Sequence, residues 1–382
     1  MTSLQHTRRS TVRAALAAEG IDALLVTDLI NVRYLTGFTG SNAALLLIAA
    51  DDEEPEQAHG HTDKATDEPD PRTRFCTDGR YTTQSQAQVP DLPRLIARPC
   101  DVALLRGPPA GSVGFEARSL TVAAYDVLQA VAADRNRPVS LRTTLDVVEA
   151  ARAIKDHTEV AALRRACALA DQALADLIAG DGLRPGRTER AVGLELDQRM
   201  RELGAEDPSF ETIVATGSNS AIPHHRPTGA LLAPGDFVKL DFGATVDGYH
   251  SDMTRTYVLG EPQPWQREIY DLVQAAQAAG RAACVVGASG AAVDAASRDV
   301  IVDAGYGPQF AHGLGHGVGL QVHEAPALAR GSASIMAADM CVTVEPGVYL
   351  PGRGGVRIED SGVIRPDGYH VLTQTSKELG VL

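Results

Sequence analysis

The stretch GDFVKLDFGATVDGYHSDMTRTYVLG, residues 235–260, predicts a β-hairpin with an aspartate on each arm. Asp247-Gly248 is a strong signal for a two-residue hairpin turn. Apolar side chains occupy alternate positions ahead of this turn, as in a strand: Val238, Leu240 and Phe242. The rest of the chain is interpreted outward from this hairpin.

A two-residue turn sets the pairing of the two arms. It places Asp241 opposite Thr254 and Asp252 opposite Gly243, so the two aspartates become diagonal neighbours on one face. Such neighbours lie about 7–8 Å apart at the backbone, within joint reach of bound ions. One alternative is a hairpin with a solvated polar face. Apolar residues flank both aspartates, however, and two buried carboxylates repel each other unless they are protonated or hold cations.

Two glutamates lie on further strand-like segments. MCVTVEPGVYL (340–350) predicts a strand that ends in Glu345. GGVRIEDSGVI (354–364) predicts an alternating strand with Arg357 and Glu359 on one face. Either glutamate alone is more often a hydrogen-bonded strand residue than a metal ligand.

Four carboxylates and a nearby histidine together form a hard, oxygen-rich set of candidate metal ligands. The carboxylates are Asp241, Asp252, Glu345 and Glu359. Their four negative charges balance two divalent cations, whereas one cation would leave excess negative charge in a partly dry site. Two ions about 3.5–4 Å apart can lower the pKa of a bridging water and polarise a carbonyl. Oxygen ligands with one imidazole suit Mn²⁺, with Co²⁺, Zn²⁺ and Fe²⁺ as alternatives.

The glycine-rich stretch AHGLGHGVGLQVHEAP (311–326) supplies three candidate histidines, His312, His316 and His323, and one glutamate, Glu324. From this stretch alone, metal ligation, catalysis and a polar role in a turn all stay open. Its glycines would allow the backbone to approach a metal or substrate closely.

Composition limits the classes of partner. The formal charge of −14, from 35 basic and 49 acidic residues, argues against a general nucleic-acid binder. No run reaches the ~18 apolar residues that span a bilayer, so no membrane partner is expected. Five scattered cysteines without a CxxC pair argue against a disulfide framework and for a reducing compartment. We therefore expect a cytoplasmic protein.

The 382 residues suggest about two domains, and the boundary is expected near residue 150. Residues 1–150 would form an N-terminal α/β domain and residues 151–382 a second domain, giving an α/β or α+β class. TRRSTVRAALAAEG (7–20) predicts a basic surface helix, and the acidic segment 51–72 predicts a mobile loop. Further segments predict strands at 22–28, 43–50 and 74–80, and helices at 9–19, 158–179, 187–203, 264–285 and 290–303.

The ordered motifs LDFG, SDMTRT, HGLGHGVGLQVHE, VEPGVY and GVRIED resemble the pita-bread metallopeptidases, in particular their aminopeptidase P and prolidase branch. The spacings from 241 to 252, from 316 to 323 and from 345 to 359 are also those of the family. NVRYLTGFTGSNAALLL (31–47) and TDGRYTTQSQAQ (77–88) are similar to the N-terminal domain of that branch. The resemblance therefore implies a creatinase-like α/β domain followed by a pita-bread catalytic domain.

The resemblance also implies a role for each ligand. Asp241 would chelate one metal, Asp252 and Glu359 would bridge both, and His316 and Glu345 would complete the other. Glu345 would also take a proton from the bridging water and pass it to the leaving proline nitrogen.

For substrate binding, the resemblance implies four further residues. His323 would steady the oxyanion, His224 would hold the substrate on the opposite wall, and His312 would line the proline pocket. Arg357 would lie behind Glu359 and orient the site. Beside His224, the residues 225–226 either add carboxylate or backbone contacts or belong to an ordinary exposed loop, which is the preferred interpretation. Glu324 drops out of the ligand set.

The resemblance implies a manganese-dependent hydrolase and a homodimer. Its substrates would be peptides with proline at the second position, cleaved at the Xaa-Pro bond as by aminopeptidase P. The alternative is an Xaa-Pro dipeptidase, or prolidase. A non-catalytic peptide- or protein-binding member of the fold would show eroded ligands, and none is eroded here. Methionine aminopeptidases lack this N-terminal domain and creatinase lacks the metal set, so both fit less well.

Overall fold

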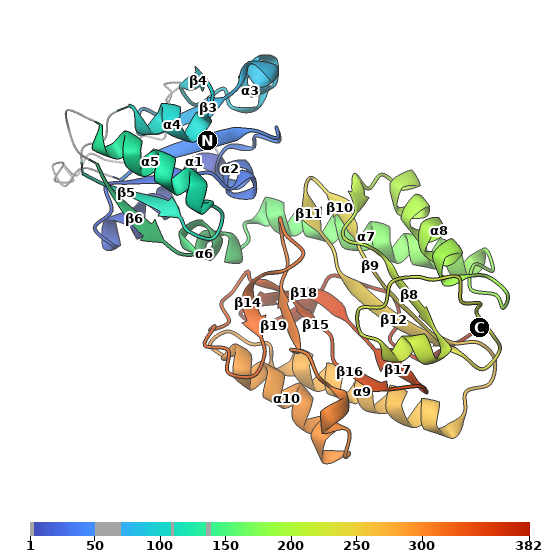
Figure 1. Ribbon diagram of the computed structural model, residues 1–382. Coiled ribbons are helices and arrows are strands. Elements are labelled where there is room, and N and C mark those ends of the chain that lie inside the picture. The colour runs from blue at the N-terminus through green and yellow to red at the C-terminus, as the bar shows by residue number, and fades with distance from the viewer. Residues whose placement is uncertain (1–3, 50–69, 108–110, 135–138) are drawn as a thin grey trace. The chain divides into compact units, whose positions relative to one another are not determined.

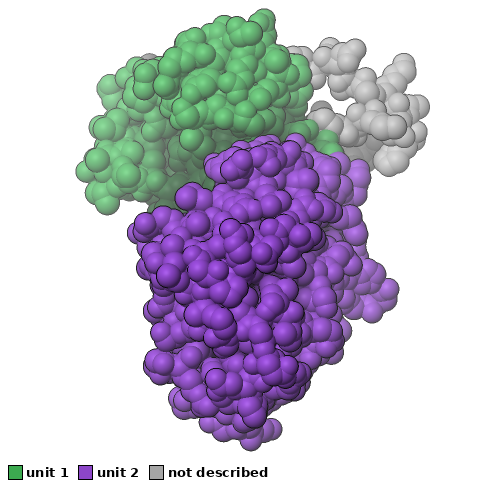
Figure 2. All heavy atoms as spheres, turned by 90° about the vertical axis from the view of Figure 1, so that its right-hand side faces the viewer, with its two compact units in different colours: residues 1–152 green, residues 153–382 purple. Residues whose placement is uncertain are grey.

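The computed structural model describes residues 4–49, 70–107, 111–134 and 139–382. The chain divides into two compact units, residues 1–152 and 153–382, which Figure 2 colours separately. The acidic loop predicted at 51–72 lies, apart from its last three residues, outside the described residues. Each unit is described by itself.

The first unit is built on a six-stranded mixed sheet with the order β4-β3-β2-β1-β5-β6. Strand β2 pairs antiparallel with β1 and β3, and the other pairs are parallel. The strands are β1 (Ala23–Val26), β2 (Ala43–Ile48), β3 (Thr73–Thr77), β4 (Arg94–Ile96), β5 (Gly111–Glu116) and β6 (Val139–Thr144). The helices are α1 (Leu4–Ala18), α2 (Leu29–Thr36), η1 (Gly79–Tyr81), α3 (Thr82–Gln88), α4 (Cys100–Leu105), α5 (Val122–Ala133) and α6 (Val147–Ala153).

Central strands of the first unit are buried on both faces, as expected when helices cover a sheet. The three strands predicted by their apolar runs are confirmed as β1, β2 and β3. The predicted basic surface helix, however, is wrong for two arginines of α1. Arg9 is 1% exposed and bonds to Asp91, while Arg13 is 4% exposed and bonds to Asp70. Buried ion pairs therefore replace the solvated face that the charges suggested.

Glu116, at the end of β5, is a buried carboxylate in the first unit. Its side chain accepts hydrogen bonds from the backbone amides of Thr27 (2.6 Å) and Asp28 (2.8 Å) and from Asn31 Nδ2 (2.7 Å). Burial nevertheless raises the pKa of Glu116 to about 7. The carboxyl group is therefore easier to protonate in the folded state than in the unfolded chain.

We expect this pKa shift to make the first unit less stable as pH rises. Because the pKa of Glu116 is higher in the folded state than in the unfolded chain, its protonation stabilises the fold. This stabilisation is complete below about pH 4.5 and is lost as pH rises through about 7. We compare the free energy of opening of the first unit in the wild type and in Glu116→Gln. The difference between the two proteins should change by roughly 3 kcal/mol between pH 4 and pH 8. Amide hydrogen exchange of residues 23–26, measured in both proteins, reports this quantity. A pH-independent difference would contradict the assignment.

The second unit places its strands between two pairs of helices (Figure 1). The helices are α7 (His157–Ala179), α8 (Glu189–Glu202), η2 (Gly217–Ala221), α9 (Pro264–Ala283), α10 (Gly290–Asp303) and η3 (Gly307–Gln309). Apolar residues of α7 and α8 pack on one core with β8, β9 and β12, and those of α9 and α10 on another with β15. The four long helices predicted from the apolar periodicity are confirmed, with ends that differ by up to two residues.

Four sheets make up the rest of the second unit, with the orders β20-β12-β9-β8, β14-β13-β15-β18-β19, β11-β10-β7 and β16-β17. The first strands are β7 (Asp207–Pro208), β8 (Ile213–Thr216), β9 (Phe237–Phe242), β10 (Ala244–Val246), β11 (Tyr249–His250), β12 (Met253–Val258), β13 (Gly315–Gly317) and β14 (Glu324–Leu328). The last are β15 (Cys341–Val344), β16 (Gly347–Leu350), β17 (Gly354–Arg357), β18 (Asp360–Arg365), β19 (Gly368–Val371) and β20 (Gly380–Val381).

The predicted hairpin register is confirmed. Asp241 of β9 pairs with Thr254 of β12, and the turn residues Asp247 and Gly248 have φ values of +51° and +75°, as a type I′ turn requires. The ladder is interrupted near Gly243, where an added Cβ would meet the Ser251 carbonyl oxygen at 1.8 Å. Only glycine allows the two arms to approach so closely at that point.

The strand predicted to end in Glu345 is confirmed as β15, and a further strand, β16, begins at Gly347. The strand predicted at 354–364 is instead a pair of strands, β17 and β18, which break at Ile358 and Glu359. Strand β15 pairs with β18, whereas β16 pairs with β17 in a separate sheet. Both faces of this run are buried, since β17 and residues 358–359 are all buried. Both glutamates therefore occupy the points where the chain leaves one sheet for another.

Candidate active site

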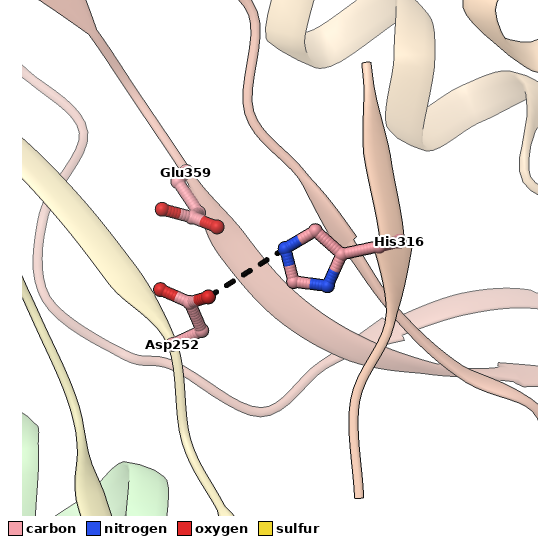
Figure 3. Close-up of side chains that lie close together, drawn as sticks. All are labelled: Asp252, His316 and Glu359. Atoms are coloured by element: carbon pink, nitrogen blue, oxygen red, sulfur yellow. Dashed lines mark ion pairs between the residues drawn. The ribbon is translucent and has the colours of Figure 1, made fainter. Parts of the chain in front are cut away.

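Five side chains predicted as metal ligands come together in the second unit, where they line one cavity of about 310 Å³. Asp241 comes from β9 and His316 from β13, whereas the other three lie beside strand ends. The five residues are Asp241, Asp252, His316, Glu345 and Glu359. Figure 3 shows three of them, Asp252, His316 and Glu359, pointing toward one another.

The distances within this group suit a shared cation. His316 Nε2 lies 3.6 Å from Asp252 Oδ2 and 3.4 Å from Glu345 Oε1. One ligand atom from each of Asp252, His316 and Glu359 lies within 4.8 Å of the others. Because an ion at their centre would be close to all three, these residues can hold a metal with little rearrangement.

His316 is oriented by the backbone. Its Nδ1–H donates to the carbonyl oxygen of Gly317 at 3.1 Å. This bond fixes the ring so that Nε2 is directed at Asp252 and Glu345. Without a metal, Nε2–H donates to Glu345, and a bound cation would take the place of this proton. A histidine arranged in this way is ready to bind a cation.

Burial makes the ionised carboxylates of the site unfavourable, and a bound cation would offset this free-energy cost. Burial, together with their mutual repulsion, raises the pKa of Asp252 and of Glu359 well above the ordinary range. Burial also opposes ionisation of Glu345, but the hydrogen bond and charge of His316 lower its pKa to about 2. Asp241 Oδ1 and Glu359 Oε1 are buried without a hydrogen-bond partner among the described residues. Unpartnered oxygens of this kind fit a metal centre.

A buried chain of hydrogen bonds runs behind the carboxylates. Arg357, which is 2% exposed, donates to Asp241 Oδ2, and its Nη1 donates to Tyr349 Oη at 2.8 Å. His312 donates from Nδ1 to the Gly313 carbonyl, so its Nε2 accepts from Tyr349 Oη at 2.9 Å. Arg357 also donates to Thr254 at 2.9 Å, and Thr254 donates to Glu359, so Arg357 is linked to Glu359 as well as bonded to Asp241; its predicted role in orienting the site stays a prediction.

Two other predicted histidines line the same cavity, His323 and His224. The ring of His323 lies 4.3 Å from that of His316, centroid to centroid. Burial and the neighbouring His316 lower the pKa of His323, which favours a neutral ring. Their predicted roles toward substrate stay predictions.

Three further residues near the site were interpreted from sequence, and one of them, His225, departs from the expectation. Glu324, excluded from the ligand set, pairs with the buried Lys155 at 3.1 Å and does not line the cavity. The exposed-loop interpretation is wrong for His225, which is 8% exposed and lies 2.8 Å from buried Glu189. Arg226 is exposed and pairs with Glu211, also exposed.

Two residues that bond to side chains of the site, Thr254 and Tyr349, were not predicted from sequence. Thr254 donates to Glu359 at 2.7 Å, and its position opposite Asp241 in the predicted hairpin was the signal that could have indicated it. Tyr349 gave no such signal, because its partner His312 lies 37 residues away. The cavity is also lined by Phe210, Glu211, Ile213 and Val322.

Comparison with known proteins agrees with this geometry. Residues 161–366 match the family described as "Metallopeptidase family M24", and residues 8–154 match the "Creatinase/Prolidase N-terminal domain". The fold and site thus define a metallopeptidase. More particularly, the chain belongs to metallopeptidase family M24.

Individual relatives are similar over most of the chain. An Xaa-Pro dipeptidase of Lactobacillus delbrueckii subsp. lactis is 41% identical and covers 70% of this chain and 72% of its own. A solved Xaa-Pro dipeptidase from Bacillus anthracis is 35% identical, with a TM-score of 0.88, over 99% of this chain and 100% of its own. A solved X-Pro aminopeptidase from Thermotoga maritima is 28% identical, with a TM-score of 0.82, over 98% and 99%.

These findings confirm the predicted family, the two-part α/β fold with a creatinase-type domain before a pita-bread domain, and a metallo-exopeptidase. The prolidase alternative is better supported than the main aminopeptidase interpretation, since the more similar relatives carry the dipeptidase name. Family membership implies a divalent metal; manganese, the homodimer and the cytoplasmic location stay predictions. Within residues 4–49, 70–107, 111–134 and 139–382, no helix is long and apolar enough to cross a membrane.

Proposed function

We propose that this chain is a dinuclear-metal Xaa-Pro dipeptidase. The observation that carries the proposal is the convergence of four carboxylates and His316 on one cavity, with oxygens of Asp241 and Glu359 left unpartnered among the described residues. Four negative charges match two divalent cations, and oxygen ligands with one imidazole suit Mn²⁺ best, with Co²⁺, Zn²⁺ and Fe²⁺ as alternatives.

The five ligands divide between two positions. Asp241 would hold one cation, Asp252 and Glu359 would serve both, and His316 and Glu345 would complete the second position. When bound, the cations supply an activated water and polarise the scissile carbonyl. Because Arg357 bonds to Asp241, and Thr254 to Glu359, both carboxylates are held in place by neighbouring side chains.

The remaining steps belong to side chains of this protein. Glu345 takes the proton of the attacking water and passes it to the leaving proline nitrogen. His323 donates a hydrogen bond to the oxyanion that develops at the scissile carbonyl. His224 lines the cavity and holds the substrate from the facing wall. His312 is not among the residues that line the cavity; it accepts a hydrogen bond from Tyr349, and its place beside the proline ring stays a prediction. An Xaa-Pro bond has no N–H, so recognition depends on shape and on the carbonyl oxygen.

Preference for a dipeptide is supported by the similarity to Xaa-Pro dipeptidases at 41% and 35% identity. The cavity, at about 310 Å³, lies at the small end of the usual range for ligand sites. Arg226 also lines it and can exchange its exposed partner Glu211 for the free carboxylate of a dipeptide. Aminopeptidase activity is the second candidate, because the similar X-Pro aminopeptidase shares the fold over nearly the whole chain.

Relative rates on two substrates test this proposal. The purified protein loaded with Mn²⁺ should cleave an Xaa-Pro dipeptide with a kcat/KM about tenfold or more above that for the Xaa-Pro-Yaa tripeptide, a difference of about 1.4 kcal/mol. Matched peptides with alanine in place of proline serve as controls. Metal analysis should find two equivalents per chain. Faster cleavage of the tripeptide would favour the aminopeptidase, and no cleavage of either with Mn²⁺, Co²⁺, Zn²⁺ or Fe²⁺ would exclude both.

A further inference from the structure

One segment of the second unit, residues 216–228, carries three side chains to the cavity wall: His224, His225 and Arg226. We call it the histidine segment. It begins at the last residue of β8 and continues through the short helix η2 (Gly217–Ala221). Residues 222–228 belong to no helix or strand. Since no regular backbone ladder fixes this part, its shape must depend on other contacts.

The histidine segment is held by a single buried carboxylate, that of Glu189 at the start of α8. Glu189 is fully buried (0% exposed). Its Oε1 accepts from the backbone amide of Thr216 and from Asn219 Nδ2, both at 2.9 Å. Its Oε2 accepts from His225 Nε2 at 2.8 Å and from Thr228, through the amide at 2.9 Å and the hydroxyl at 2.6 Å. All five donors thus belong to the histidine segment.

The hydrogen-bond acceptor positions of the Glu189 carboxylate are all occupied. A carboxylate offers about four lone-pair directions, and Glu189 fills them with donors from the two ends and the middle of one segment. Burial opposes its ionisation, but these hydrogen bonds hold the pKa of Glu189 below its ordinary value. Among the described ion pairs, its one partner is His225. Glu189 itself does not line the cavity.

We propose that Glu189 is a positioning residue of the active site, which holds the histidine segment in the shape that brings His224 against the substrate. The inference rests on the proposed function in one respect, the role of His224. Glu189 acts from the side of the segment that faces α8, and His225 is the link between the carboxylate and the cavity wall. Lys239 and Arg357 support the same segment from the strand side by donating to the Pro223 carbonyl.

A double-mutant cycle between Glu189→Gln and His224→Ala tests this inference. In Glu189→Gln the new amide group faces donors instead of accepting from them, so the segment shifts. A displacement of about 1 Å can cost about 100-fold, and we expect kcat/KM for Xaa-Pro to fall by about this factor. Metal content should change little, because no metal ligand lies on the segment.

The cycle separates positioning from general destabilisation. If Glu189 acts through His224, Glu189→Gln should have little further effect in the His224→Ala background. Equal losses in both backgrounds would overturn the inference, even if the wild type cleaves Xaa-Pro dipeptides as proposed. Glu195→Gln is the matched control, because Glu195 lies on the same helix but pairs with Arg187 and Arg199. This control should keep wild-type kinetics.

Two further measurements keep the inference testable. Thr228→Val removes one hydroxyl bond to Glu189 at an exposed position, so the variant should fold, and we expect about a tenfold loss in kcat/KM, in line with one such bond. Amide hydrogen exchange requires no substrate. It should rise in residues 217–228 of Glu189→Gln and stay unchanged in β9 and β15. Unchanged exchange in the segment would overturn the inference whatever the enzyme cleaves.

Discussion

The His316→Ala variant is expected to lose bound metal and to cleave Xaa-Pro dipeptides at least about 1,000-fold more slowly than the wild type. A bound cation supplies several kcal/mol of transition-state stabilisation, and each 1.4 kcal/mol is a factor of ten in rate. His316 is the one imidazole among the five candidate ligands, and its Nε2 lies within 3.6 Å of both Asp252 and Glu345. Without it, one of the two metal positions has carboxylate ligands alone.

The same variant should remain folded. The imidazole is 16% exposed, so its removal leaves a gap open to the cavity rather than a closed void in the core. The backbone of β13 keeps its pairing with β14 and β15. Metal analysis by mass spectrometry and the kcat of the same preparation should therefore fall together, with an unchanged circular dichroism spectrum. Normal metal content and normal activity would contradict the ligand assignment.

His323→Ala is the matched control for this experiment. Its ring is 4.3 Å from that of His316, so both variants remove an imidazole from the same wall of the cavity. As an oxyanion donor, His323 should be worth about 100- to 1,000-fold in kcat, while metal content stays at the wild-type level. Loss of metal in both variants would mean that the cavity wall, and not ligation, controls metal binding.

Local patterns in the sequence predict the elements of this fold well. The hairpin could be predicted to the exact pairing of Asp241 with Thr254, because a two-residue turn leaves no freedom of register. The long helices follow from their apolar periodicity in the same way. The helix α1 shows the limit of such patterns, since Arg9 and Arg13 look like surface residues but are buried against Asp91 and Asp70. Partners that lie more than 50 residues away leave no local signal.

In the candidate site, too, some residues could be predicted from the sequence and others could not. Its five ligands could be proposed because their residue types and spacings resemble one family, and the structure brings all five to one cavity. Of the groups behind the ligands, Arg357 was expected from the resemblance, whereas Tyr349 and Glu189 were not. Tyr349 reaches His312, 37 residues away, and Glu189 reaches five donors 27 to 39 residues away. These contacts arise only when sheets and helices distant in the chain pack together.

The break at Ile358 and Glu359 has a similar origin. Alternating apolar residues predict one strand at 354–364, but the chain changes sheets at Ile358 and Glu359. Because both faces of this run are buried, polar alternation does not mark solvent here. Glu359 is directed toward the other carboxylates, where its charge is costly for folding. Metal binding therefore favours a carboxylate at position 359, whereas folding without a metal disfavours its charge.

The cost of a buried charge in this site can be measured at Asp252, the candidate bridging ligand. Asp252 is 5% exposed, and burial followed by the charges of Glu359, Asp241 and Glu345 raises its pKa well above the ordinary range. Without a metal, the folded state must either protonate the group or bear the repulsion. Asparagine has nearly the same size, carries no charge, and can donate its amide hydrogens to Glu359.

The Asp252→Asn variant should therefore be more stable than the wild type without metal and inactive with it. We expect the metal-free variant to unfold at a midpoint several degrees higher at pH 8, since about 1–2 kcal/mol corresponds to roughly 2–8 °C for a unit of this size. Trp265, the single tryptophan, lies in the second unit and packs on Phe237, so its fluorescence reports unfolding there. Added Mn²⁺ should raise the midpoint of the wild type but not that of the variant, whose kcat should be at least about 1,000-fold lower. A metal-free variant less stable than the wild type would show that Asp252 is held by its neighbours rather than repelled by them.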